Sequence, residues 1–502
     1  MAGVSALCIV LMLLAVAGRS SARIARAGAG GSGTVRAAGA LEPPAVRGGG
    51  CRKLASSGLA RPVSRDPGAP DPPAVLPSGP PELPAVAPET FQGRVIDAGT
   101  DRPLADAIVT LGHSTVRTGG TGNFSIEGRG ERIGVRAYGH VRLWVSRAAL
   151  ARAGGEVALP AFIPKALYLT SNGIACPQLR AEALELARTT QVNALVIDLK
   201  SERGVVAFPS RAPLALAIGA EQPSLIPSLK SLVDFLHARG LYAIARIVVF
   251  RDSLLAEARP DLAVRTDRGA LYRDGEGMAW TDPFSRKVWN YNIAIAVEAA
   301  RAGFDEIQFD YVRFPDAPGL VFSQPSTQRS RIAAISGFLA LARGALAPYN
   351  VFTAADIFGY VCWNAGDTGI GQTLQGILPE VDYVSPMLYP STFQYGIPGY
   401  RDPVAHPYHV VLLSLQRALG RTGVSPDRFR PWLQAFKDYA FDRRAFGAAQ
   451  IQAQINAATA AGTDGWMLWN PRNIYTSAGL QPRPPAEQQV GTPHLKGAVP
   501  VE

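Results

Sequence analysis

The hydrophobic pattern of the chain changes near residue 164. Beyond this point, short apolar runs alternate with amphipathic stretches whose apolar residues recur at helical spacing. The apolar runs predict strands at residues 166–171, 193–201, 241–250, 304–314, 351–358, 381–389, 430–436 and 465–469. The amphipathic stretches, among them 179–189, 228–239, 285–302, 331–345 and 446–461, predict helices between the strands. Eight strands separated in this way favour an α/β fold, a (β/α)8 TIM barrel, over a doubly wound sheet, which usually has fewer strands.

Residues before the predicted barrel follow a different pattern. Apolar and polar residues alternate with period two in short runs at 92–97, 107–111, 122–126 and 133–137, and turn residues separate these runs. Short strands at this spacing are typical of a β-sandwich. We therefore expect a small N-terminal β-sandwich in front of the barrel.

The two ends of the chain lack the periodicity of a folded domain. Residues 4–17 form an apolar run of signal-peptide length, too short for a bilayer that needs about 20 helical residues. A Gly/Ala-rich and then Pro-rich stretch follows, which cannot bury enough apolar surface to fold. The predicted organisation is a signal peptide or anchor (1–27), a disordered linker (28–89), the sandwich (90–163), the barrel (164–475) and a disordered tail (476–502). We expect an exported protein, periplasmic, extracellular or associated with the cell envelope through its N-terminal segment.

The charge distribution argues against a nucleic-acid partner. The chain has 50 Lys and Arg against 40 Asp and Glu, a net charge of +10, and most of this excess lies before residue 164. A nucleic-acid-binding protein concentrates basic charge on its working domain, whereas the predicted barrel is nearly neutral. Four cysteines without Cys-x-x-Cys, and no His-x-x-x-His, predict no metal site. No Gly-rich phosphate loop opens a helix, so we expect no nucleotide cofactor.

Polar and aromatic side chains collect where the predicted strands end. In a (β/α)8 barrel, catalytic and binding residues lie at the carboxyl ends of the strands. The residues expected in the site on this ground are Tyr168, Asn172, Asp198, Lys200, Arg246, Asp310, Arg313, Asp356, Tyr389, Gln434, Trp469 and Asn470. Period-two alternation points Asp198, Lys200 and Asp310 into the barrel mouth. The alternative is that these charged residues form ion pairs that only fill the top of the barrel.

Two of these carboxylates suit the cleavage of a glycosidic bond, which requires a pair of carboxyl groups. Asp310 and Asp356 end neighbouring strands, whose spacing of about 4.8 Å lets both face one sugar. We expect Asp310 to be an ionised nucleophile assisted by Arg313. Apolar neighbours should raise the pKa of Asp356 and suit it to be the general acid. Aromatic faces for sugar stacking come from Trp363, Tyr389 and Trp469.

Two loops are candidates for contact with a substrate. Residues 366–372 (Gly-Asp-Thr-Gly-Ile-Gly-Gln) follow the fifth strand. They either hold Asp367 beside the sugar or use Asp367 or Thr368 as a helix N-cap. Residues 251–282 form a loop long enough to be a lid or a subsite.

Five segments in order resemble a bacterial glycoside hydrolase domain family: 194–200 (ALVIDLK), 304–315 (FDEIQFDYVRFP), 355–359 (ADIFG), 366–372 (GDTGIGQ) and 381–390 (VDYVSPMLYP). That family is similar to the barrels of α-amylases and α-galactosidases. The resemblance implies that Asp310, which ends the fourth strand, is the nucleophile. It implies an acid/base on a later strand, Asp356 on the fifth, or a loop residue such as Asp402 if the sixth supplies it.

A second resemblance concerns the β-rich module. Residues 93–111 and 118–124 resemble the carboxypeptidase regulatory-like domain, with a Pro-Leu-x-x-Ala-x-Val stretch and a Thr-x-x-x-Gly-x-Phe turn. This resemblance implies a small sandwich without catalysis of its own, which acts as a spacer, a docking module or a weak carbohydrate contact.

Two other functions remain open beside a glycosidase with a carbohydrate substrate. Lys200 could be the Schiff-base amine of a lyase or aldolase, since burial can lower the pKa of a lysine. The barrel could also be a non-catalytic binding protein for cell wall or polysaccharide. The identity of the sugar and the oligomeric state cannot be predicted from these patterns.

Overall fold

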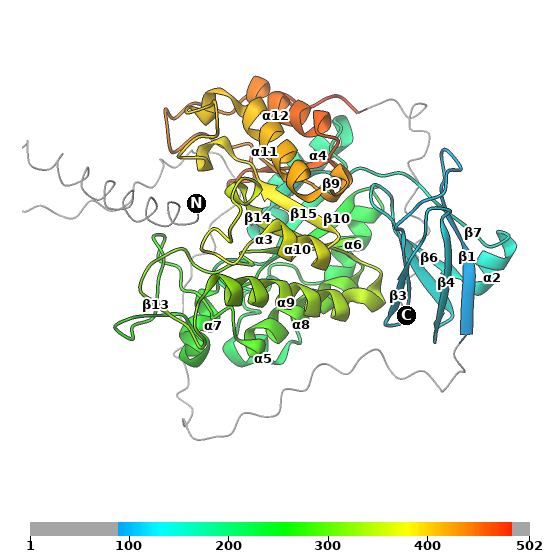
Figure 1. The fold of residues 1–502 in the computed structure, drawn as a ribbon, viewed down its shortest axis with the longest axis horizontal. Coiled ribbons are helices and arrows are strands. Elements are labelled where there is room, and N and C mark those ends of the chain that lie inside the picture. The colour runs from blue at the N-terminus through cyan, green and yellow to red at the C-terminus, as the bar shows by residue number, and fades with distance from the viewer. Residues whose placement is uncertain (1–88, 484–502) are drawn as a thin grey trace, which may run out of the picture. The chain divides into compact units, whose positions relative to one another are not determined.

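The structure is a computed structural model that describes residues 89–483 (Figure 1). The predicted signal segment, the predicted linker before Glu89, and residues 484–502 of the predicted tail lie outside this range. The rest of the predicted tail is ordered. Thr190 forms a β-bridge with Pro482, and Arg483 donates to the carbonyl oxygens of Thr189 (3.0 Å) and Ala187 (3.0 Å). Residues 476–483 are therefore anchored on the barrel, and the expectation of a loose tail from residue 476 is wrong for them.

Eight parallel strands close into a barrel, as the hydrophobic pattern predicts. They follow the order β10-β12-β14-β15-β16-β17-β8-β9. Their bounds are β8 (Lys165–Leu169), β9 (Ala194–Lys200), β10 (Tyr242–Val248), β12 (Glu306–Asp310), β14 (Phe352–Phe358), β15 (Tyr383–Met387), β16 (Trp432–Gln434) and β17 (Trp466–Trp469). Several strands are shorter than predicted. β12 ends at Asp310 because Tyr311 adopts a left-handed backbone conformation (φ 48°) that leaves the sheet.

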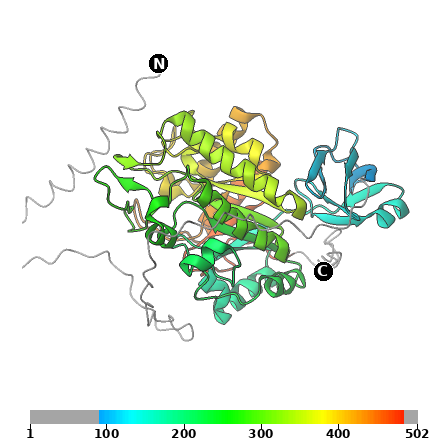
Figure 2. The same ribbon diagram turned by 90° about the horizontal axis from the view of Figure 1, so that it is seen from below.

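Helices surround the strands, as Figures 1 and 2 show. The longer ones are α4 (Pro177–Thr189), α6 (Leu229–His237), α8 (Arg286–Ala302), α9 (Gln328–Leu346), α11 (Pro407–Thr422) and α12 (Ala448–Ala460), and the short ones are α3 (Ser171–Ala175), α5 (Pro213–Ile218), α7 (Ser253–Ala258) and α10 (Leu374–Ile377). Between β14 and β15 only α10 and short 3-10 turns occur, so this connection is mostly irregular. No helix follows β17 within the described residues, which end at Arg483.

One barrel helix also has the length and composition of a membrane span. Residues Gln328–Tyr349, which include α9, have a mean hydropathy of 1.4 over their most apolar window. Phe338, Leu339 and Ala342 of this helix are buried in the core between helices and strands. The apolar character of α9 is therefore explained by its packing on the barrel.

Strand residues divide between two cores, as period-two alternation requires. Outward-facing residues such as Ile307 and Phe309 pack against the helices. Inward-facing residues, including Tyr168, Val196 and Trp432, form a separate cluster inside the barrel. The inward set positions the candidate site, because its polar members meet at the carboxyl ends of the strands.

The N-terminal module consists of two small sheets around one core that includes Phe91, Val109 and Ile126. The first sheet contains β1 (Glu89–Asp97), β4 (Asn123–Gly128) and β7 (Glu156–Leu159), and the second contains β2 (Ile108–Leu111), β3 (Ser114–Arg117), β5 (Arg132–Arg136) and β6 (Leu143–Ser146). The short α2 (Arg147–Arg152) joins β6 to β7. A sandwich was expected here, and its resemblance to a regulatory-like domain stays a prediction.

Candidate active site

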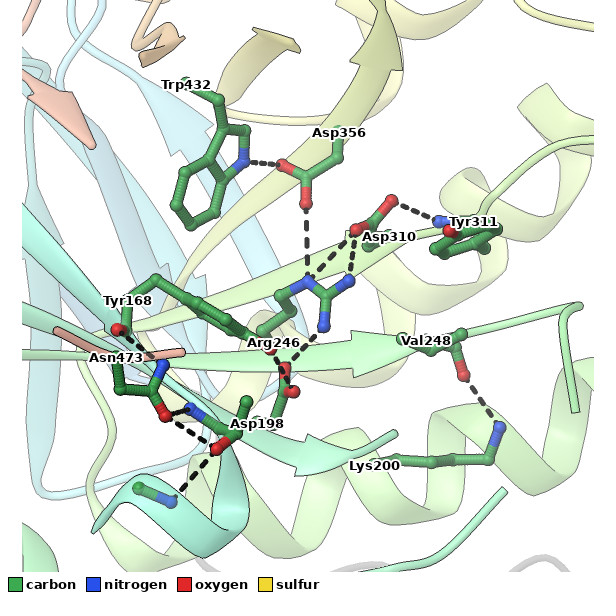
Figure 3. Close-up of polar contacts among 12 residues, drawn as sticks. Tyr168, Asp198, Lys200, Arg246, Val248, Asp310, Tyr311, Asp356, Trp432 and Asn473 are labelled. Carbon is green, nitrogen blue, oxygen red and sulfur yellow. Dashed lines mark hydrogen bonds and ion pairs between the residues drawn. The ribbon is translucent and has the colours of Figure 1, made fainter. Parts of the chain in front are cut away.

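Three carboxylates from three strands surround one guanidinium group (Figure 3). Arg246 Nη1 lies 2.5 Å from Asp198 Oδ1, and Arg246 Nη2 lies 2.5 Å from Asp310 Oδ2. Arg246 Nε lies 3.0 Å from Asp310 Oδ2 and 4.0 Å from Asp356 Oδ2. We refer to Arg246 and these three aspartates as the carboxylate cluster.

The strand register brings the cluster together. Arg246 of β10 is level with Asp198 of β9, and Val248 of β10 is level with Asp310 of β12. Phe309 of β12 is level with Ala355 of β14, so the next residues of these strands, Asp310 and Asp356, are neighbours. The sequence predicted that these carboxylates end neighbouring strands. Their shared contact with Arg246 depends on the pairing of β10 with strands on both of its sides.

Asp310 is held from two directions. Arg246 donates two hydrogen bonds to Oδ2, and the backbone N–H of Tyr311 donates to Oδ1 at 2.5 Å. Tyr311 itself adopts a left-handed backbone conformation, and its hydroxyl accepts from Arg251 at 2.9 Å. A strained backbone at a non-glycine residue is a common feature of active sites.

Asp356 is fully buried, and only one of its two carboxylate oxygens accepts a hydrogen bond. Trp432 Nε1 donates to Oδ1 at 2.8 Å, whereas Oδ2 has no hydrogen-bond partner. Burial, followed by the negative charge of Asp310, raises the pKa of Asp356 well above its usual range, and Arg246 opposes this shift. This environment favours the protonated form of Asp356, and Oδ2, which has no hydrogen-bond partner, is the oxygen free to carry the proton.

Asp198 completes the cluster on the other side. Tyr168 donates its hydroxyl to Oδ2 at 2.5 Å. Burial raises the pKa of Asp198 to about 6, although Arg246 and Tyr168 act in the opposite direction. The carboxylate of Glu202, just beyond β9, contributes to this rise and to the raised pKa of Tyr168. Glu202 is partly exposed, and no sequence signal marked it as a site residue.

Aromatic rings line the cluster. Tyr168 stacks on Trp469 with ring centroids 3.8 Å apart, and the Arg246 guanidinium lies 4.9 Å from the Trp469 ring. Tyr389 belongs to the inward-facing cluster of buried side chains. Burial, followed by the charges of Asp356 and Asp310, raises the pKa of its hydroxyl well above the usual range. Trp432 was not predicted, although it shares the inward face of its strand with Gln434, two residues later.

Lys200 does not point into the barrel mouth, which corrects the alternation argument. A β-bulge makes Leu199 an extra residue of β9, so that Lys200 is level with Ile247. Lys200 Nζ instead donates to the Val248 carbonyl oxygen at 2.7 Å (Figure 3). It also lies 2.8 Å from Asp252 Oδ2, and both side chains are fully buried. Burial lowers the pKa of Lys200, and Asp252 opposes this shift. Its side chain is fully buried and remote from the cluster, which removes the support for a Schiff-base role.

Arg313 is not the partner of Asp310 either. Its guanidinium lies over the rings of Trp280 (4.8 Å) and Tyr311 (5.3 Å) and donates to the Phe314 carbonyl oxygen. Arg246, expected only to bind substrate, supplies the charge that was assigned to Arg313. The reason is that Arg313 lies beyond the end of β12, after the chain has turned at Tyr311.

Several predicted substrate-binding residues have structural contacts instead. Asp367 accepts from Arg331 of α9 and from the N–H groups of Gly369 and Gly371, which favours the turn interpretation of that loop. Gln434 and Asn470 bond to neighbouring loops, Asn172 is exposed on α3, and Trp363 bonds to α11. Asp402 caps a short 3-10 turn at the surface. The structure shows no contact between these residues and the cluster.

The donors present do not form a metal site. Within residues 89–483, no group of three or more His, Cys, Asp or Glu side chains is arranged to hold a metal ion. The Arg246 guanidinium occupies the position between the three carboxylates where a cation would otherwise bind.

Comparison with known proteins defines the class. The model of the family described as "Putative glycosyl hydrolase domain" matches residues 166–475, which is the whole barrel. Together with the closed barrel, this match places the protein among the glycoside hydrolase enzymes. The chain belongs to that family. None of the curated proteins compared with the chain matches it.

Three solved structures are similar to the chain. A hypothetical protein from Ruminiclostridium thermocellum is 35% identical, and the match covers 38% of this chain and 96% of that one with a TM-score of 0.35. The PgaB (BpsB) glycoside hydrolase domain from Bordetella bronchiseptica is 15% identical over 62% and 95% of the two chains, with a TM-score of 0.44. A class V chitinase from Pseudomonas fluorescens is 13% identical over 66% and 99%, with a TM-score of 0.38.

Proposed function

We propose that the protein hydrolyses O-glycosidic bonds of an oligosaccharide or polysaccharide with Asp310 and Asp356 as the two carboxyl groups. Asp310, ionised beside Arg246, attacks the anomeric carbon or stabilises the positive charge that develops there. Asp356, protonated through burial, donates its proton to the leaving oxygen. Asp198 and Tyr168 are positioning residues, because they act through Arg246.

The observation that carries this proposal is the proximity of the two carboxyl groups. Arg246 Nε lies 3.0 Å from Asp310 Oδ2 and 4.0 Å from Asp356 Oδ2, so these two oxygens are at most 7.0 Å apart. Retaining glycosidases place their carboxyl groups about 5–5.5 Å apart, and inverting ones about 6.5–9.5 Å apart. A separation of at most 7.0 Å is short enough for a two-carboxylate mechanism.

The two acids differ in environment in the way that such a mechanism requires. Asp310 accepts two hydrogen bonds from a guanidinium and one from a backbone N–H. Asp356 receives one hydrogen bond from an indole and lies next to a negative charge. We therefore expect the alkaline limb of the pH–rate profile to report loss of the Asp356 proton.

Substrate access requires a rearrangement of the side chains above the cluster. Asp310 is 4% exposed and Asp356 is not exposed at all. Tyr389 and Trp469 are two of the aromatic residues of the inward-facing cluster, and Trp469, which lies beside the Arg246 guanidinium, is partly exposed. We propose that displacement of these rings uncovers the carboxyl groups and that the rings then contact the sugar.

The test compares single variants of the full chain on aryl glycosides and on bacterial wall and capsule polysaccharides. Asp356→Asn should lower kcat/KM by about 10²–10⁴-fold on substrates with a poor leaving group, because it removes the proton donor. Asp310→Asn should lower it further, by on the order of 10⁴-fold or more. Asp402→Asn, the surface cap, is the matched control and should retain wild-type activity.

Two results would overturn the proposal. If Asp310→Asn hydrolyses substrate at the wild-type rate, Asp310 is not the nucleophile. Glycan binding by the wild type without hydrolysis of any substrate would instead favour the second candidate, a non-catalytic polysaccharide-binding barrel. The complete burial of Asp356 is the observation that keeps this second candidate in view.

A further inference from the structure

A cavity of about 570 Å³ lies beside the irregular connection between β14 and β15. Its lining includes Tyr360, Trp363, Asn364, Ile397 and Arg417. These residues come from the 3-10 turn η3 (Gly359–Cys362) and the residues after it, from the loop after β15, and from α11. The cavity thus combines two aromatic rings, an amide and a guanidinium, and none of its lining residues is acidic.

The aromatic side chains of this cavity are fixed in place. Trp363 Nε1 donates to Ser414 Oγ of α11 at 2.8 Å. The Tyr360 hydroxyl donates to the Gly396 carbonyl oxygen at 3.0 Å and accepts from the Tyr395 N–H at 3.0 Å. Rings held in this way lose little conformational entropy when a ligand binds.

Arg417 differs from the other arginine on the same face of α11. Arg421 donates to the carbonyl oxygens of Val361 (2.8 Å) and Cys362 (3.0 Å) and thereby fixes η3. Arg417, one turn earlier, is exposed and makes no ion pair or side-chain hydrogen bond with any residue between Glu89 and Arg483. Ser414 and Arg417 are three residues apart, so the Trp363 anchor and the free guanidinium lie on one face of the helix.

Two chain segments connect the lining of the cavity with residues near the carboxylate cluster. η3 directly follows β14, which carries Asp356. The turn η5 (Pro390–Thr392) directly follows Tyr389, and the next residue, Phe393, packs on Tyr360 with ring centroids 4.8 Å apart. The cavity and the cluster are therefore both built on the segments that follow β14 and β15, the ground on which we place them along one glycan chain.

We propose that this cavity is a subsite for a carboxylate-bearing sugar of the glycan that the enzyme cleaves. The inference rests on the proposed function for its connection to catalysis. The apolar face of the sugar packs on the Tyr360 and Trp363 rings. Arg417 binds the sugar carboxylate, because a planar guanidinium can donate two parallel hydrogen bonds to a carboxylate. Asn364 supplies an amide for the hydroxyl groups.

The experiment measures binding by the full chain carrying Asp310→Asn, which prevents turnover. The probes are oligosaccharides of galacturonate, mannuronate and hyaluronan, titrated calorimetrically against neutral malto- and cello-oligosaccharides of the same length. At least one acidic probe should bind more tightly than every neutral one. Adding Arg417→Ala should weaken that binding about tenfold or more and remove its salt dependence. Adding Trp363→Ala should weaken the binding of all probes, and Gln416→Ala, an exposed neighbour on α11, should change nothing.

The proposal is overturned if acidic probes bind no better than neutral ones, or if Arg417→Ala binds acidic probes as well as its parent. Failure of the subsite and failure of the proposed function give different results. Hydrolysis by the wild type with no effect of Arg417→Ala on binding removes the subsite alone. An Arg417-dependent preference for acidic probes, with no hydrolysis of any substrate by the wild type, supports the cavity as a binding site and removes the catalytic proposal.

Discussion

Arg246 is the residue on which the charge balance of the candidate site depends. It is buried and provides the counter-charge for Asp198 and Asp310. Replacing it in Arg246→Met leaves these carboxylates buried without that partner, which should lower the free energy of unfolding at pH 7 by about 3–5 kcal/mol. Urea unfolding followed by circular dichroism measures the change. The loss should be smaller at pH 4.5, because protonation of Asp198 relieves it.

The matched control is Arg313→Met, since Arg313 was expected from the sequence to fill this role and makes no ion pair with Asp310. It should destabilise the protein by less than half as much. Equal destabilisation by the two variants would mean that the pairing of Arg246 with the carboxylates is not the source of the effect.

At the scale of elements, the β-bulge of β9 fixes the start of α7. The bulge turns Lys200 outward to Asp252, whose Oδ1 also accepts the Leu255 N–H and caps α7. Lys200→Met should destabilise the protein by about 3–5 kcal/mol, because Asp252 is then left as an unpaired buried charge. The double variant Lys200→Met/Asp252→Ala should be less destabilised than the sum of the single variants. Thermal and urea unfolding of the four proteins give the coupling energy.

The Lys200→Met variant also tests whether Lys200 has a structural role or forms a Schiff base. A structural Lys200 predicts that Lys200→Met keeps the glycosidase activity of its folded fraction. If the variant instead folds with unchanged stability, and the wild type forms an adduct on Lys200 that borohydride reduces, then the lyase interpretation is correct and the structural one is wrong.

At the scale of the whole molecule, the pH dependence of stability combines groups of opposite sign. The pKa of Asp198 is raised to about 6, so the folded protein holds a proton there that the unfolded chain loses near pH 4. Its contribution is present below about pH 4 and is lost as the pH rises through about 6. Hydrogen bonds lower the pKa of Asp97 and Asp438 to about 2. Their contribution is present above about pH 4 and is lost as the pH falls toward 2.

The Asp198→Asn variant isolates the contribution of Asp198 to the pH dependence of stability. The difference in unfolding free energy between wild type and variant should become less favourable to the wild type by about 3 kcal/mol between pH 4 and pH 7. Denaturant titrations across this range measure it. A difference that is constant with pH would show that Asp198 titrates alike in the folded and unfolded states.

The barrel holds a second buried arginine between carboxylates, which shows that such a cluster is not by itself a catalytic site. Arg430 pairs with Glu306 and Asp464, and Glu306 begins β12 at the amino end of the strand. Clusters at the amino ends of barrel strands support the fold, whereas chemistry occurs at the carboxyl ends. Position along the strand therefore distinguishes the carboxylate cluster from its counterpart.

The sequence by itself determined the barrel and the placement of its acids. The strands lie in apolar runs of the sequence, and Asp310 ends one such strand while Asp356 lies two residues before the end of the next. Local patterns carry this information because burial of a strand acts on every residue along it.

Only the tertiary structure decided which side chains of the candidate site contact one another. The bulge that turns Lys200 away arises from the pairing of β9 with β10, and Arg246 meets Asp310 because β12 lies beside β10. The indole of Trp432 reaches Asp356 only after the barrel has closed. These contacts join residues that are 48 to 76 positions apart, so no local pattern encodes them.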